Sequence, residues 1–194
     1  MYGNVLNAVF HESILIYISN FGSDKLIYYL RNSIFTEKLP MFTRMDQSTK
    51  QEWEHISEQH MPHIFDMPNR IMGMLKQLQG LTLGFSTDQL HHALQTATMA
   101  RRAGAEDEMV LISLIHDIGK VISVPNHGQI AAEMIKPYVS DDAYNVIRTH
   151  QDFQGEHYYQ YMGKPQDLRK QFVNESWYAK AEEFTDEWDQ AAFD

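Results

Sequence analysis

An apolar run, residues 110–115, ends directly in the dipeptide His116-Asp117, so two potential metal ligands adjoin a segment that must be buried. Burying a carboxylate without a partner is costly in free energy, which favours a cation beside Asp117. A capping aspartate next to a core histidine would give the same dipeptide. Because the dipeptide alone does not distinguish these interpretations, the residues around it must decide.

Most of the chain shows the punctuation of successive helices. Ser86 followed by Gln89 is a capping-box pattern, and Gly104 is a typical residue after a helix C-terminus. We expect a second helix over 107–117, ended by Gly119. Further helices should start after Asn126 and Ser140 and stop before Pro137 and near Gly163 and Pro165, and residues 167–192 should form one or two acidic amphipathic helices. Without strand alternation or an internal repeat, the sequence predicts an all-α helical bundle.

The composition limits the chemistry and the partners of the chain. Its 194 residues are 43% hydrophobic, enough for one substantial core, and the absence of cysteine excludes disulfides and thiolate metal sites. The formal charge of −10, with six carboxylates and no Lys or Arg over 182–194, disfavours nucleic acid and anionic membranes as partners. No secretory signal is evident because the first basic residue is Lys25, so we expect a soluble cytoplasmic protein.

The first 40 residues differ in composition from the rest. Ile, Tyr, Leu and Asn dominate 1–40, and charged, helix-like sequence begins at Asp46. We expect 1–40 to be an accessory segment: a dimerising arm that would make a homodimer, a packing arm, or an upstream extension unrelated to the core chemistry. Residues 41–194 are expected to form the helical core.

Further potential metal ligands stand around the dipeptide: His92 or its neighbour His91, His127, His150 and Asp189. Each has a simpler alternative when taken alone, namely a surface histidine, a polar or charged residue at a helix end, or a solvated acidic face. Together, four imidazoles and two carboxylates suffice for two metal ions about 3.5–4 Å apart. Such a nitrogen-rich set suits Fe, Mn, Co or Zn better than Mg or Ca.

The segment QLHHALQTATMARRAGA followed by LIHDIGK resembles the HD-domain superfamily, and more narrowly its mixed-valent diiron oxygenases. These are the myo-inositol oxygenases and the organophosphonate-cleaving oxygenases, in which a Q-x-x-H-x-x-Q-[TC]-A segment precedes the HD dipeptide. The residues that fit this segment are Gln89, His92, Gln95, Thr96 and Ala97. The resemblance extends over roughly 67–189 and selects His92, which lies 24 positions before His116, over His91.

The resemblance implies an HD-domain helical bundle that holds two iron ions, Fe2+ and Fe3+, with Mn, Co or Zn as alternative metals. The implied ligands are His92, His116, Asp117, His127, His150 and Asp189, the last in the Trp188-Asp189 element rather than at Asp186. Asp117, as the bridge between the ions, and Lys120, as a contact to the substrate, would be the catalytic residues. Gln89 and Gln95 would not bind metal themselves but would fix the orientation of the residues that do.

Three positions depart from the organophosphonate-cleaving enzymes. Those enzymes have a lid Tyr and Glu ten and seven positions before the first histidine, where this chain has Thr82 and Phe85. They also have a Lys four residues after the fourth histidine, where this chain has Gln154. Lys120 matches the lysine with which the inositol oxygenases contact substrate, although HD phosphodiesterases share it.

Three functions are compatible with these residues. We expect an oxygenase that uses O2 to oxidise and cleave a small hydroxylated substrate, a polyol or a hydroxyphosphonate-like molecule. The alternative is a metal-dependent phosphohydrolase acting on a phosphate ester or nucleotide, against which the few basic residues near the motifs weigh. A non-catalytic HD module that binds a ligand or partner is the third, and the intact ligand set disfavours it.

Overall fold

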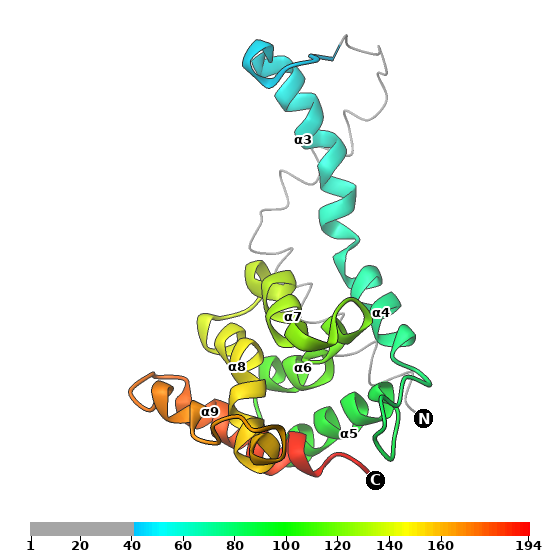
Figure 1. Cartoon of the computed structure of the whole chain (residues 1–194). Coiled ribbons are helices and arrows are strands. Elements are labelled where there is room, and N and C mark those ends of the chain that lie inside the picture. Colours follow the sequence, from blue (N-terminus) through cyan, green and yellow to red (C-terminus); the bar gives the residue numbers. More distant parts are fainter. Residues whose placement is uncertain (1–40) are drawn as a thin grey trace. The chain divides into compact units, whose positions relative to one another are not determined.

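The structure, a computed structural model, describes residues 41–194, and the described chain contains helices, turns and loops but no strand (Figure 1). The predicted all-α class is therefore confirmed. The predicted accessory segment 1–40 lies outside the described residues. The chain divides into two compact units, Met1–Arg70 and Ile71–Asp194, which are considered separately below.

The described part of the first unit consists mainly of one helix, α3, Lys50–Phe65. Thr49 and Glu52 form a reciprocal capping box at its start, which satisfies backbone donors that the first turn would otherwise leave free. The next helix, α4 (Met67–Gln77), contains the division between the two units.

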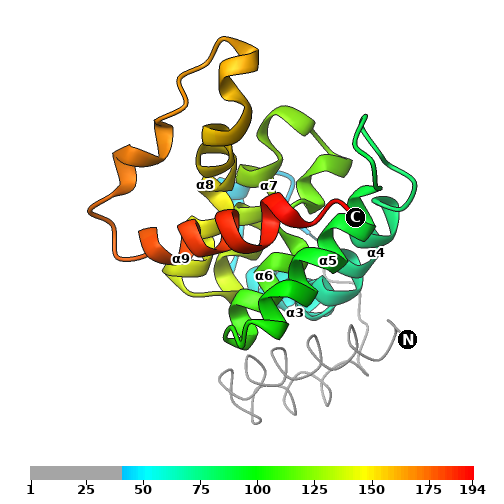
Figure 2. The same ribbon diagram turned by 90° about the horizontal axis from the view of Figure 1, so that it is seen from below.

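The second unit is a bundle of helices around a shared core. Its main helices are α5 (Gln89–Arg102), α6 (Asp107–Ile115), α7 (His127–Ile135), α8 (Asp141–Tyr158) and α9 (Tyr178–Glu183). Here α5 packs on α6 and α7 packs on α8, while the chain after α9 returns to lie along α5 and α8 (Figure 2). Fully buried side chains at the centre include Ile112, Ile115, Ile118, Ile147, Phe153 and Phe184.

Helix α6 is apolar around most of its circumference and is correspondingly buried. The prediction that this helix runs to residue 117 was wrong, because α6 ends at Ile115 and the chain turns into a 3₁₀ helix, Ile118–Val121. Gly119 makes this turn feasible: a Cβ there would lie 2.1 Å from the backbone oxygen of His127. The close approach brings the chain around His116-Asp117 against the start of α7.

One predicted helix start also needs correction. Helix α5 is capped by Asp88, whose Oδ1 accepts from the backbone N–H of His91 at 2.8 Å, and not by Ser86, which donates to the carbonyl of Phe193 at 2.7 Å. Helix α7 does begin directly after Asn126, as predicted, although the Asn126 side chain makes no capping hydrogen bond. Ser140 does cap α8, as predicted, by accepting from the N–H of Ala143.

The acidic C-terminal region is less regular than the predicted one or two amphipathic helices. It consists of a 3₁₀ helix (Leu168–Phe172), the short α9, a π-helical segment (Phe184–Trp188) and a final 3₁₀ turn (Asp189–Ala191). Phe184, Trp188 and Asp189 are buried here, so tertiary packing rather than periodicity sets the backbone. Among the described residues, no helix combines the length and the apolar character that crossing a bilayer requires.

Candidate metal centre

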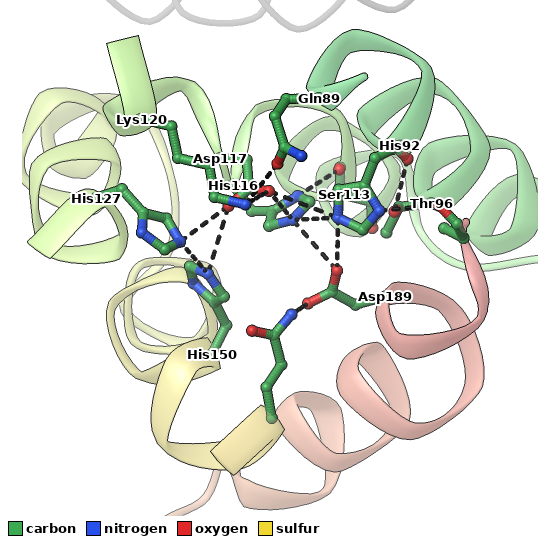
Figure 3. Close-up of polar contacts among 12 residues, drawn as sticks. Gln89, His92, Thr96, Ser113, His116, Asp117, Lys120, His127, His150 and Asp189 are labelled. Atoms are coloured by element: carbon green, nitrogen blue, oxygen red, sulfur yellow. Dashed lines mark hydrogen bonds and ion pairs between the residues drawn. The ribbon is translucent and has the colours of Figure 1, made fainter. Parts of the chain in front are cut away.

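Six side chains from separate elements converge inside the second unit (Figure 3). His92 projects from α5, His116 and Asp117 from the turn after α6, His127 from the first turn of α7, His150 from α8, and Asp189 from the last 3₁₀ turn. None of the six is more than 5% exposed. The residues that the sequence singled out are thus brought together, and His91, the rival of His92, is exposed.

Asp117 lies between two pairs of histidines, as Figure 3 shows. Its Oδ1 lies 2.9 Å from Nε2 of His127 and 3.6 Å from Nε2 of His150. Its Oδ2 lies 3.3 Å from Nε2 of His116 and 3.5 Å from Nε2 of His92. Each carboxylate oxygen therefore faces one histidine pair, the arrangement that a bridging ligand between two cations needs.

Asp189 completes the group on the His92 side. Its Oδ1 lies 2.9 Å from Nε2 of His92 and 3.3 Å from Nε2 of His116. The donor atoms thus divide into a cluster with two imidazoles and two carboxylates and a cluster with two imidazoles and the shared Asp117.

Backbone carbonyls fix the orientation of all four imidazoles. The Nδ1 atoms of His92, His116, His127 and His150 lie 2.6–2.9 Å from the carbonyl oxygens of Ala192, Ser113, Val124 and Ile147, respectively. Because a carbonyl only accepts, each Nδ1 must carry the proton and donate it. In a neutral ring this leaves the lone pair on Nε2, the tautomer that binds metal.

The converging lone pairs are suited to a cation. The Nε2 atoms of His127 and His150 lie 3.0 Å apart, and those of His92 and His116 lie 3.3 Å apart. Oδ1 of Asp117 and Oδ1 of Asp189 are buried and have no hydrogen-bond donor. Unsatisfied acceptors in a buried site are costly, and their mutual repulsion adds to that cost. The donor set and its geometry therefore fit metal ions.

Protons can relieve this repulsion only in part. Burial opposes a charge on His116, but the Asp117 and Asp189 carboxylates outweigh burial and raise the pKa of His116 to about 10. Burial lowers the pKa of His150, so this ring is neutral at pH 7. Burial acts to raise the pKa of the Asp117 and Asp189 carboxyls, but the neighbouring His116 outweighs burial and holds the pKa of both below the usual range. A proton on His116 does not reduce the repulsion between the Nε2 lone pairs of His127 and His150. A metal ion bound by both atoms would remove it.

Lys120 links the candidate centre to its surroundings. Its ammonium donates to Oδ2 of Asp117 at 2.5 Å and to Oε1 of Gln89 at 2.6 Å. Gln89, predicted to orient a ligand, thus contacts Lys120 and acts on Asp117 only through it. Gln95, for which the same role was predicted, donates to the backbone carbonyl of Asp194 instead.

Two contributors were not assigned a role from the sequence. Gln154, one helical turn after His150 on α8, donates to Oδ2 of Asp189. The ring of Phe193 stacks on His92, with centroids 4.6 Å apart. The i, i+4 spacing from His150 is a signal that could have pointed to Gln154, whereas nothing in the local sequence marks Phe193.

A cavity of about 720 Å³ opens beside the six residues. His92 and His127 contribute to its wall, together with Lys120 and Gln154, so a bound molecule can reach both histidine pairs. Further lining residues come from the 83–85 and 124–125 loops, the end of α8 and the C-terminal segment.

Comparison with known families agrees with this geometry. A family model described as HD domain matches residues 90–177, and a model described as myo-inositol oxygenase matches residues 41–132. Each match covers slightly less than half of the chain, and over these ranges the chain is similar to HD-domain proteins and to the myo-inositol oxygenases. The two matches support a metal-dependent enzyme related to these families. Between them the matched ranges include five of the six converging residues, and Asp189 lies beyond both.

Comparison with a curated relative does not indicate a function, because that relative is itself uncharacterized. The chain is 28% identical over 109 residues to an uncharacterized protein of Acanthamoeba polyphaga mimivirus, an alignment that covers 49% of this chain and 50% of that protein. The chain thus spans about half the length of the curated relative that it matches.

Proposed function

We propose that this protein is a non-haem diiron oxygenase that uses O2 to oxidise and cleave a small hydroxylated substrate, a polyol or a hydroxyphosphonate-like molecule. The observation that carries the proposal is the position of Asp117, with one carboxylate oxygen toward each pair of histidine Nε2 atoms. The relation to the myo-inositol oxygenases supports iron as the metal and O2 as the second substrate.

The six residues would hold the two ions in unequal surroundings. His92, His116 and Asp189 would bind one ion, His127 and His150 would bind the other, and Asp117 would bridge them. When bound, such a pair supplies Lewis-acid activation of a substrate hydroxyl and electrons for O2 reduction. The His92 cluster would supply one more carboxylate than the His127 cluster, so the side of His127 and His150 would leave more room for exogenous molecules.

The rest of the pocket would position the substrate. Lys120 uses two of its three ammonium donors on Asp117 and Gln89, which leaves one to bind an anionic or alkoxide oxygen of the substrate. Gln154 holds Oδ2 of Asp189, so Oδ1 of that residue stays directed at His92 and His116. The stacked rings of Phe193 and Phe85 add an apolar surface to the pocket.

Electron paramagnetic resonance during stepwise anaerobic reduction tests this proposal. Iron-loaded protein should contain two irons per chain and should give the signal of a coupled Fe(II)/Fe(III) pair, which appears and then vanishes as reduction continues. Oxygen consumption with a panel of polyols and hydroxyphosphonates should follow. Two bound metals without a mixed-valent state at any stage would contradict the oxygenase.

A phosphohydrolase is the alternative that this experiment separates, since it would use the same ligands. It would release inorganic phosphate from an ester under strictly anaerobic conditions. The described lining of the pocket offers two lysines, Lys120 and Lys164, and no arginine, which is little charge for gripping a polyphosphate. This lining is the reason to prefer the oxygenase.

A further inference from the structure

The pocket beside the candidate centre carries an aromatic wall that begins at a candidate ligand. Phe193 stacks on His92 at 4.6 Å with an interplanar angle of 18°, and Phe85 stacks on the outer face of Phe193 at 5.2 Å and 15°. Three nearly parallel rings thus form one continuous surface. Phe85, at the end of the stack, remains 49% exposed, so its ring is available to a ligand.

Other exposed apolar side chains gather at the same pocket. Among the large hydrophobic residues of the second unit that the structure describes as exposed, Leu83, Val124 and Met162 line it together with Phe85. Exposed apolar residues that cluster rather than scatter mark a binding surface. The cavity of about 720 Å³ is also within the range of pockets that enclose drug-sized ligands.

The loop that carries part of this surface is held in a costly conformation. Leu83 has φ of 51°, and it is the one residue other than glycine with a positive φ in the described part of the chain. A bulky side chain rarely adopts this region, so surrounding contacts must hold it there. The result is that Leu83 and Phe85 both reach the pocket.

The charged residues that line the pocket, Lys120 and Lys164, are both basic. None of the lining residues that the structure describes is an aspartate or a glutamate, although the whole chain has a net charge of −10. The Nζ atom of Lys120 lies 5.8 Å from the centre of the Phe85 ring. The Lys120 ammonium and the Phe85 end of the aromatic wall are therefore adjacent, so a ligand can use a polar head and an apolar body at once.

We propose that the substrate of this pocket is an alcohol or hydroxy acid with an apolar chain or ring of several carbons. Its oxygen-bearing end binds at Lys120 and the candidate centre, and its apolar body lies on Phe85 and Phe193. This inference rests on the proposed function, and among small hydroxylated substrates it favours one with an apolar body over a polyol or a short hydroxyphosphonate. A fully hydroxylated ring would bury its hydroxyl groups against the aromatic wall without hydrogen bonds, which is unfavourable.

Ligand binding to zinc-loaded protein tests the inference without turnover, because zinc does not change its redox state. Calorimetric titration would compare 2-hydroxy acids from lactate to 2-hydroxyoctanoate with myo-inositol and hydroxymethylphosphonate. We expect affinity to rise by about fourfold for each added methylene group until the wall is covered. The polyol and the short phosphonate should bind more weakly than the longest acid.

Two variants test whether the Phe85 ring contributes to the affinity for the apolar chain. Phe85→Gln should weaken binding of 2-hydroxyoctanoate by about tenfold and flatten the dependence on chain length. Tyr161→Gln removes an aromatic ring that is 84% exposed and does not line the pocket, so it should leave both unchanged. Both positions are exposed, and a thermal melt would verify that each variant is folded.

The outcomes separate the inference from the proposed function. Affinity independent of chain length, or tighter binding of myo-inositol, would overturn the apolar-body substrate even if the iron-loaded protein gave a mixed-valent signal. The expected chain-length dependence in a protein that shows no mixed-valent state would refute the oxygenase while leaving the ligand class in place.

Discussion

Oδ1 of Asp117 lies 2.9 Å from Nε2 of His127, and when the His127 ring is neutral neither atom has a proton to share. His127 uses its ring proton at Nδ1, which lies 2.7 Å from the carbonyl oxygen of Val124. A lone pair therefore faces a carboxylate oxygen inside the protein. A cation between the two atoms converts this repulsion into attraction, and Nε2 of His92 faces Oδ1 of Asp189 at 2.9 Å in the same way.

Metal content should fall unequally when different ligands are replaced. His127→Gln should lower the content from two ions per chain to one, because the His92 cluster stays intact. Asp117→Asn should lower it further, because an amide is a weak bridge and both clusters share this residue. Inductively coupled plasma mass spectrometry on dialysed protein measures both effects.

His91→Gln is the matched control for His92→Gln. The two histidines are adjacent on α5, but His92 is buried in the cluster and His91 is exposed. The first variant should keep two ions and the second should lose one. Equal losses from both variants would contradict the assignment of His92.

Removing the metal should make the stability of the protein depend on pH above neutrality. In the metal-free protein the pKa of His116 is raised to about 10, from about 6.5 in the unfolded chain. Protonation of His116 therefore stabilises the fold, and this contribution is fully present below pH 6.5. This stabilisation is lost as pH rises toward 10. Denaturant titrations of metal-free protein should thus give a lower free energy of unfolding at pH 9.5 than at pH 6.5.

Two comparisons isolate this effect from other titrating groups. The metal-loaded protein should show a smaller pH dependence, because a metal ion occupies Nε2 of His116. Metal-free His116→Gln should show the same reduced slope. A slope equal to that of the metal-free wild type in both would assign the pH dependence to other residues.

The candidate ligands could be singled out from the sequence by their order and spacing together, although each alone has a simpler explanation. His116-Asp117 follows an apolar run, and His92 and His127 stand in the first turns of their helices, whereas His150 lies in the middle of α8. A buried polar residue in such a context has few structural explanations. The same logic predicted the all-helical class, since periodicity and capping residues act within one or two turns.

Features that depend on contacts distant in sequence could not be predicted. Ser86 has the capping-box spacing, but Asp88 caps α5 because it also accepts from the N–H of Gly80, and Ser86 is drawn to the C-terminal Phe193. The role of Gln154 requires knowing that α8 faces Asp189, which lies 35 residues away. Tertiary packing decided each case.

Gln154 should position Asp189 for metal binding. Gln154→Leu leaves Oδ2 of a buried carboxylate without its donor, and losing such a partner behind a metal ligand weakens metal affinity by about 10–100-fold. Competition with a chromophoric chelator measures that affinity. Gln151→Leu is the control, because Gln151 lines the same pocket but makes no described hydrogen bond to a candidate ligand. Equal losses in both variants would indicate a general effect of pocket polarity.

Gly119 should be required for the turn that joins the two clusters. In Gly119→Ala the new Cβ would lie 2.1 Å from the backbone oxygen of His127 and 2.8 Å from its Cα, so backbone rather than a flexible side chain must move. Overpacking of this kind typically costs about 1–3 kcal/mol. It should also displace His127 from Asp117, so the metal content should fall with the free energy of unfolding.

Gly73→Ala, on α4 with no atom within 4 Å of the new Cβ, should instead stabilise the helix by about 0.5–1 kcal/mol and keep the metal. Urea titration with metal analysis on both variants tests this, and a Gly119→Ala protein that keeps both its stability and two ions would show that the close approach at His127 is not needed to form the centre.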